Sequence, residues 1–166
     1  MCGDLMVFLV KNSHSYFSES LQKALEINKL NLSESAQIYL IYMLDDFISA
    51  ERTFAGIERK EQIYFTDLLN RALDSSDQEA LRIFRYMGDI SLYLLGFFKK
   101  ISLNKKMPSS YYISMGSLAY SQASYISRLY AANNAAIFLE LSEQFIFIVE
   151  TFKNMSFHNS SNNNFL

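Results

Sequence analysis

Apolar side chains recur along most of this chain at spacings of three and four residues, which is the period of one face of an α-helix. Such stripes predict helices over residues 15–28, 34–54, 58–73, 77–101, 110–132 and 135–155. Only five glycines and one proline interrupt the chain, so few turns are expected. The pattern predicts an all-α, single-domain bundle of five to six helices, two of them about 23 to 27 residues long.

Polar residues mark the predicted helix starts. Ser33 followed by Glu34 has the form of an N-cap with negative charge in the first turn. Ser76 and Glu79 have the spacing of a capping box. Pro108 suits the entry to the helix that follows it, because proline is favoured at the first turn. These signals indicate at least three separate helix starts.

The two ends of the chain differ from its centre. The apolar run 5–10 is expected to belong to the first helix or to form a packed arm. The stretch 156–166 contains four Asn, three Ser and no charge, which is typical of a disordered tail. We therefore predict one helical domain over 1–155 followed by this tail.

The low charge of the chain narrows its possible partners. Charged residues make up 19% of the sequence, below the roughly 25% usual for soluble domains. Either oligomerisation or a compact aromatic core would account for this. The net charge of −2 argues against nucleic acid as a partner, because that needs a basic face. A basic cluster lies where a helix is predicted to end, which suits the helix dipole better than a phosphate or lipid-headgroup site: Lys99, Lys100, Lys105 and Lys106.

The sequence also predicts where the protein is located. Cys2 is the only cysteine, so no intrachain disulfide and no cysteine-based zinc site is expected. No stretch approaches the 18 consecutive apolar residues that would indicate a membrane span. The run 5–10 is too short for a signal-peptide core. A cytoplasmic protein without a membrane span is the expectation.

Metal, cofactor and nucleophile motifs are absent from the sequence. The two histidines, His14 and His158, lie near the ends of the chain, and no Glu-x-x-His pair occurs. Asp45 and Asp46 are adjacent, so on a helix their side chains diverge by about 100°. No phosphate loop, dinucleotide fingerprint or Gly-x-Ser-x-Gly motif is present. We expect no metal, no cofactor and no catalytic residue of these classes.

A serine stripe is the most unusual feature of the chain. Between Lys106 and Arg128 there is no charge, and serines recur there at spacings of four and three, on one helix face: Ser110, Ser114, Ser117, Ser121 and Ser124. Small hydroxyl side chains let another backbone come close. Tyr120 and Tyr125 flank the stripe, and tyrosine suits protein interfaces. The candidate contact surface is therefore Ser114, Ser117, Ser121, Ser124, Tyr120 and Tyr125.

A charged cluster is the alternative candidate site. Arg82, Arg85 and Asp89 share one stripe in an otherwise largely apolar helix. Arg85 can pair with Asp89 across one turn, either as a solvated or structural pair or in a polar site. If buried, the aspartate would have a raised pKa and could act as an acid or base.

Glycines and other small residues indicate where helices cross closely. Gly88 and Gly96 lie on the same predicted helix, although glycine inside a helix costs about 1 kcal/mol relative to alanine. The next helix carries a second track of small residues: Gly116, Ala119, Ala123 and Ser127. Tight internal packing is the preferred interpretation over a binding groove.

Two resemblances bear on the family. The segments Tyr86-Met87-Gly88-Asp89, Gly96-Phe97-Phe98 and Tyr111-Tyr112-Ile113-x-Met115-Gly116-x-x-Ala119-Tyr120 resemble a pattern in uncharacterised bacterial helical proteins, which implies helical structure and no particular chemistry. Met1-Cys2-Gly3 resembles the start of N-terminal-cysteine amidotransferases, in which the exposed cysteine attacks an amide. That family is built on stacked sheets, which the helical pattern here does not match.

The sequence leaves two functional hypotheses. The first is a non-enzymatic interaction or regulatory module, which would form a homodimer or hold a protein partner through the helix 110–132 surface. The second is a bundle that binds a small apolar ligand, or an enzyme of unknown reaction, with an aromatic pocket near Asp89 in which Arg85 and a tyrosine supply polar contacts.

Overall fold

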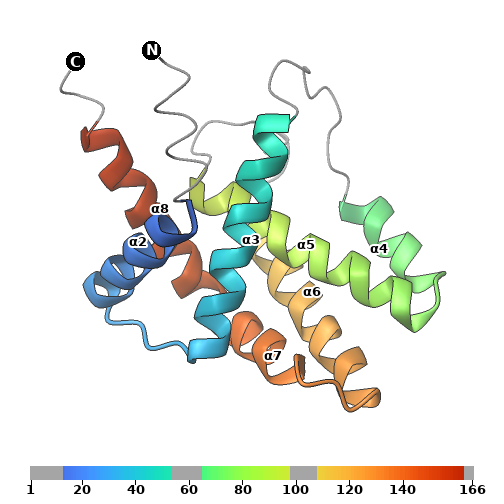
Figure 1. Ribbon diagram of the computed structural model, residues 1–166. Coiled ribbons are helices and arrows are strands. Elements are labelled where there is room, and N and C mark those ends of the chain that lie inside the picture. The colour runs from blue at the N-terminus through green and yellow to red at the C-terminus, as the bar shows by residue number, and fades with distance from the viewer. Residues whose placement is uncertain (1–12, 54–64, 98–107, 163–166) are drawn as a thin grey trace.

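The computed structural model describes residues 13–53, 65–97 and 108–162, and within these ranges it contains seven helices and no strand (Figure 1). The all-α prediction is confirmed, but the predicted count of five to six is too low. The helices are α2 (Ser13–Asn28), α3 (Glu34–Thr53), α4 (Phe65–Leu73), α5 (Asp77–Phe97), α6 (Ser109–Leu129), α7 (Ala135–Glu143) and α8 (Phe145–Asn162).

The additional helix comes from a break at Gln144, which divides the predicted helix 135–155 into α7 and α8. The Gln144 amide still donates to the carbonyls of Glu140 and Ser142. The hydrogen-bonded chain is therefore nearly continuous, and the apolar spacing hides the break. The change of direction lets α7 pack mainly on α6 while α8 packs on α5 and α2.

Helix α6 has 21 residues and ends earlier than the predicted helix 110–132. Helix α5 is described over 21 residues to Phe97, and its predicted end at residue 101 lies outside the described residues. Helix α6 ends because Ala131 adopts a left-handed conformation with φ 49°, and the Ala132 amide then donates to the carbonyl of Ser127 at 2.9 Å. Helix α8 continues to Asn162, through part of the predicted tail.

The helix starts and the inward faces follow the local predictions. Ser33 caps α3, since its Oγ accepts a hydrogen bond from the Ala36 amide at 3.2 Å. In the same way, Oγ of Ser76 accepts a hydrogen bond from the Glu79 amide at 3.5 Å. In α2 the buried residues lie at the spacing of the apolar stripe that predicts a helix over 15–28: Phe17, Leu21, Ala24 and Leu25. Capping and burial in these helices are thus set by local sequence.

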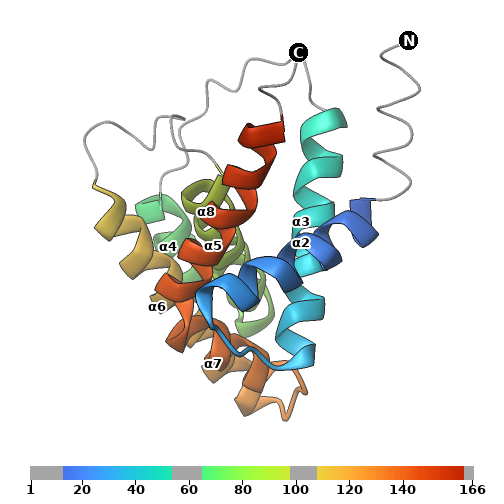
Figure 2. The same ribbon diagram turned by 90° about the vertical axis from the view of Figure 1, so that its left-hand side faces the viewer.

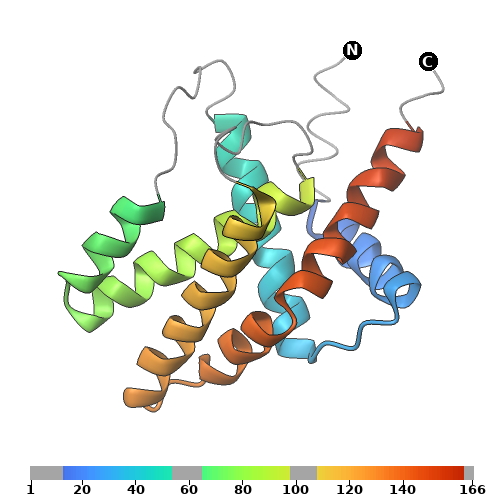
Figure 3. The ribbon, with the colours of Figure 1, turned by 180° about the vertical axis from the view of Figure 1, so that it is seen from behind.

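Helix α5 lies at the centre of the bundle. It contacts α3, α4, α6 and α8, with α3 on one side in Figure 1 and α6 on the other side in Figure 3. From Met87 to Gly96 all its residues except Leu94 are buried. Figure 2 shows α2 lying across α3 and α8 at the edge of the bundle, and both contact it. Side chains between Met87 and Gly96 therefore meet other helices in almost every direction.

Glycines allow the closest of these crossings, as the sequence predicts. A Cβ on Gly88 would lie 2.6 Å from the ring of Tyr120, and one on Gly96 would lie 2.4 Å from Cβ of Phe152. Gly116 on α6 faces Phe145 in the same way, at 2.4 Å. The glycines of α5 and α6 are thus used for tight internal packing.

Several predicted features lie outside the described residues. These are Met1-Cys2-Gly3, the run 5–10, Phe54, the first part of the predicted helix 58–73, Ile101, the four clustered lysines, and 163–166. Among the helices that are described, none has both the length and the apolar character needed to cross a membrane.

Candidate functional site

Asp89 lies in the middle of α5, and its carboxylate is held by tyrosines from two other helices. Its Oδ1 accepts a hydrogen bond from the Tyr39 hydroxyl of α3 at 2.6 Å and another from the Tyr120 hydroxyl of α6 at 2.7 Å. The Asp89 side chain is only 12% exposed. Gly88 makes the second bond possible, because the Tyr120 ring passes over the position where a larger residue would place its Cβ.

Arg85 completes this cluster from one turn earlier on α5. Its Nε donates to the Tyr39 hydroxyl at 3.0 Å and lies 3.8 Å from Oδ2 of Asp89. Its guanidinium carbon lies 5.3 Å from the centre of the Tyr39 ring, in a cation–π position. The predicted Arg85–Asp89 pair is therefore present, but it belongs to a four-residue network: Tyr39, Arg85, Asp89 and Tyr120.

Burial dominates the protonation behaviour of this network. Removal from water raises the pKa of Asp89 to about 6, against the lowering effect of the hydrogen bonds from Tyr39 and Tyr120 and of the Arg85 charge. Burial and the nearby carboxylate also raise the pKa of both tyrosines above its usual range. At neutral pH, therefore, Asp89 is mainly ionised and both tyrosines keep their protons to donate.

A surface hollow of about 400 Å³ opens beside the network, between α3 and α5. Helix α3 contributes Met43, Asp46 and Phe47 to its lining, and helix α5 contributes Arg82, Arg85, Tyr86 and Asp89. Asp46 is exposed and close enough to contribute to the raised pKa of Asp89. The predicted charged cluster, Arg82, Arg85 and Asp89, thus faces one hollow together.

Two groups at this hollow keep unused hydrogen-bonding capacity. Among the described residues, Oδ2 of Asp89 has only the 3.8 Å approach of Arg85, which is too long for a hydrogen bond. Arg85 uses Nε toward Tyr39, and no described residue accepts from its two Nη groups. A bound molecule could therefore donate to the carboxylate and accept from the guanidinium.

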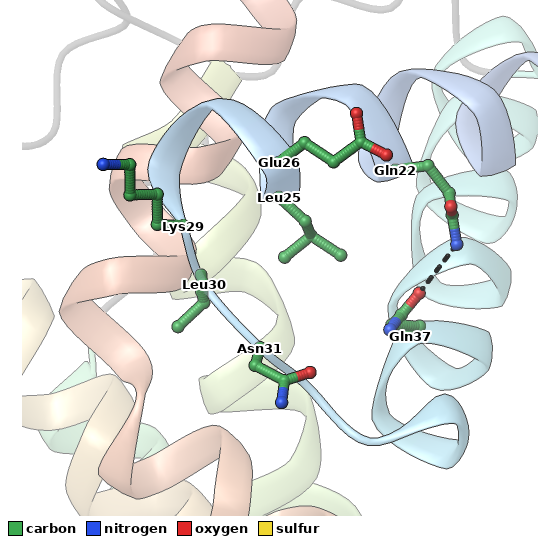
Figure 4. Close-up of a pocket in the computed structure, with 7 residues that line it drawn as sticks. All are labelled: Gln22, Leu25, Glu26, Lys29, Leu30, Asn31 and Gln37. Atoms are coloured by element: carbon green, nitrogen blue, oxygen red, sulfur yellow. Dashed lines mark hydrogen bonds between the residues drawn. The ribbon is translucent and has the colours of Figure 1, made fainter.

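A second hollow, of about 250 Å³, lies between α2, the segment after it and the start of α3 (Figure 4). Gln22 and Gln37 face each other across it, and Nε2 of Gln22 donates to Oε1 of Gln37 at 3.3 Å. The Lys29 ammonium points away from the other lining side chains. The α3–α5 hollow is the better candidate site, because it is larger and contains a nearly buried carboxylate.

The predicted serine–tyrosine surface is divided by the tertiary structure. Ser117 exchanges hydrogen bonds with Ser142 of α7, at 3.0 Å to the carbonyl of Ser142 and 2.8 Å in return. Ser124 donates to the carbonyl of Ala135 at 2.8 Å. Tyr120 is completely buried, so its placement on a contact surface is wrong. These three residues face the protein's own helices because α7 folds back along α6.

The remaining members of that surface stay accessible. Ser114, Ser121 and Tyr125 are exposed, and Leu118 lies between them at the same helical spacing. We call Ser114, Leu118, Ser121 and Tyr125 the outer α6 stripe. Ser117 is not a suitable position for testing it, because a change there would also disturb the α6–α7 contact.

Sequence reasoning missed half of the polar network and most of the hollow. Tyr39 was not singled out, nor were Phe47 and Tyr86 as lining residues. A signal was available for Tyr120, because a glycine directly before a buried aspartate marks a place where a large side chain approaches. Tyr39 lies 50 residues from Asp89, and nothing local connects the two.

The acidic and histidine residues form no metal site in the part of the chain that the structure describes. No group of three or more potential ligands comes together there. Asp45 turns toward α2, where its Oδ2 lies 3.0 Å from Nδ1 of His14, while Asp46 faces the hollow. The adjacent aspartates thus diverge, as their spacing predicts.

Comparison of the chain with protein-family models, with curated proteins and with solved structures finds no match. The resemblance to bacterial helical proteins therefore stays a prediction.

Proposed function

We propose that this protein binds a small amphipathic molecule in the hollow between α3 and α5. The observation that supports this most strongly is the Asp89 carboxylate, which is nearly buried yet keeps Oδ2 without a hydrogen-bond donor among the described residues. Burying a carboxylate is unfavourable, and such groups concentrate at functional sites. Apolar side chains beside it, Met43 and Phe47, supply contact area for the rest of the ligand.

A binding role accounts for the geometry better than catalysis does. Asp89 is held by two tyrosines and an arginine, all of which favour its charged form. The described residues that line the hollow include no serine, cysteine or histidine, so they supply no nucleophile–base pair of these types. The hollow suits recognition by charge, hydrogen bonding and apolar contact.

The test is a titration of the protein with 2-phenylethanol, a neutral amphipathic probe, in which two-dimensional NMR measures the shifts of the backbone amides. We expect shifts of amides in α3 and α5, and binding weakened at least about fivefold by Tyr86→Ala, which removes an aromatic wall. Tyr125→Ala is the matched control, because it removes an exposed tyrosine from α6. Equal effects of the two variants would refute the proposal, as would absence of shifts around the hollow both with 2-phenylethanol and with its charged analogues.

A second candidate function is a protein–protein contact through the outer α6 stripe. This stripe has no charge, and its two large residues are substantially exposed, Leu118 by 44% and Tyr125 by 57%. Uncharged surface with an accessible tyrosine is typical of the buried part of an interface. The contact that we propose for this stripe is a homodimer.

A further inference from the structure

The α3–α5 hollow carries opposite charges side by side. Asp46 lies on the α3 wall, while Arg82, Arg85 and Asp89 lie on the α5 wall. Nε of Arg85 and Oδ2 of Asp89 are 3.8 Å apart, so a positive and a negative group meet at one point. A ligand that reaches this point meets both charges within the span of a few bonds.

The orientation of Arg85 adds to this pattern. The Tyr39 hydroxyl occupies the Nε edge of the guanidinium, and the Tyr39 ring lies against its face. This leaves the two Nη groups, which together can bind a carboxylate in a bidentate manner. Tyr39 therefore fixes the side chain in place and keeps its binding edge available.

From this juxtaposition we infer that the hollow takes a zwitterion of the α-amino acid type with an aromatic or large apolar side chain. This rests on the proposed binding function. The ammonium group pairs with Asp89 Oδ2 and Asp46, and the carboxylate pairs with Arg85 and Arg82. The side chain lies against Met43, Phe47 and Tyr86, two of which are aromatic.

Ligands with one charge fit this arrangement less well. An ammonium without a carboxylate would lie near the Arg85 guanidinium with nothing to offset the repulsion. A carboxylate without an ammonium would meet the same problem at Asp89 and Asp46. An α-amino acid carries both groups on one carbon, which matches the short separation between the two protein charges. A volume of about 400 Å³ is also within the range of small-ligand sites.

The experiment compares four probes of nearly equal size on the full chain at pH 7.5 by two-dimensional NMR. L-phenylalanine carries both charges and 2-phenylethanol carries none. 3-Phenylpropanoate carries only the negative charge, and 2-phenylethylamine carries only the positive charge. We expect phenylalanine to bind at least about fivefold more tightly than each of the others, because each lacks at least one charged contact.

Two variants assign the contacts to residues. Asp46→Asn should weaken the binding of phenylalanine and leave that of 3-phenylpropanoate unchanged or stronger. Arg82→Gln should weaken the binding of phenylalanine and leave the binding of 2-phenylethylamine unchanged or stronger. Both positions are exposed, so the fold should tolerate these changes. Asp67→Asn and Arg71→Gln, on exposed positions of α4, are the matched controls.

The outcomes separate this inference from the function on which it rests. If a singly charged probe binds as tightly as phenylalanine, or if only 2-phenylethanol binds, the zwitterion inference is wrong and the binding function stands. If no probe shifts the amides around the hollow, both are wrong. Selective binding of phenylalanine that Asp46→Asn and Arg82→Gln leave unchanged would also refute the assigned contacts.

Discussion

Asp89 shows at the level of one residue how position in a fold changes the chemistry of a side chain. Its neighbours in sequence are apolar or small, and two tyrosines and an arginine reach it from three helices. Burial raises its pKa even though the hydrogen bonds and the Arg85 charge act in the opposite direction. The ionised form therefore costs folding free energy, and that cost depends on pH.

The protein should become less stable as pH rises through about 6, because of Asp89. Its pKa is about 6 in the folded state against 3.8 as its ordinary value, so the folded state binds the proton more tightly. Tighter proton binding stabilises the folded state fully below pH 3.8, and this stabilisation is lost as pH rises through 6. The free energy of unfolding falls by up to about 3 kcal/mol as a result. The groups that face Asp89 are Tyr39 and Asp46 of α3, Arg85 of α5 and Tyr120 of α6.

Asp89→Asn tests this without removing the hydrogen bonds to Oδ1. Urea denaturation at pH 4.5 and pH 8 should show the variant gaining stability relative to the natural protein as pH rises. Any constant effect of placing an amide near Arg85 cancels between the two pH values. Asp67→Asn, at an exposed position, should show a smaller change. A difference between Asp89→Asn and the natural protein that does not vary with pH would contradict the assignment.

At the level of elements, the contact between α5 and α6 is the most extensive in the described bundle. Gly88 and Gly116 let these helices and their neighbours approach closely. The same approach brings the Tyr120 hydroxyl to Asp89, so packing and the polar network depend on one crossing. Helix packing here positions the candidate site.

Gly88→Ala should destabilise the protein although alanine favours helix formation. The added methyl group would lie 2.6 Å from the ring of Tyr120, which is fully buried, so the ring or the helices would have to shift. We expect a loss of about 1 to 3 kcal/mol, which exceeds the gain of about 1 kcal/mol in helix propensity. The measurement is urea denaturation. When Tyr120 is also changed to leucine, Gly88→Ala should cost less stability. If Gly88→Ala alone is as stable as the natural protein, the close crossing is disproved.

At the level of the whole molecule, α7 decides which part of α6 is internal. It folds back along α6 and covers Ser117 and Ser124 while the outer α6 stripe stays exposed. The part of α6 before Arg128, which carries no charge, thus has two different faces. Only the outer one is available for self-association.

If the outer α6 stripe forms a homodimer, Ser121→Lys should convert the protein to a monomer. The reason is that two like charges would be brought together at an uncharged, desolvated contact. Light scattering during gel filtration near micromolar concentration measures the mass, and circular dichroism checks that the helices are retained. Arg71→Lys on α4 is a control that should not change the mass. A natural protein that is already monomeric, or a Ser121→Lys dimer, rejects this contact.

Local patterns determined the helical class, the capping residues Ser33 and Ser76, and the buried face of α2. Each depends on residues within a few positions of one another, where the helical period and the capping hydrogen bonds act. The stripe of Arg82, Arg85 and Asp89 was also visible, because it follows a single helix face.

The tertiary structure alone decided which helices meet. Tyr39 and Tyr120 approach Asp89 from 50 and 31 positions away in the sequence. The cover that α7 places over Ser117 follows from the turn at Ala131, which reverses the chain between α6 and α7. Helical periodicity tells which side of a helix is buried but not which partner buries it. The partner is selected by packing across the whole bundle, and for this chain that selection made both the polar network and the hollow beside it.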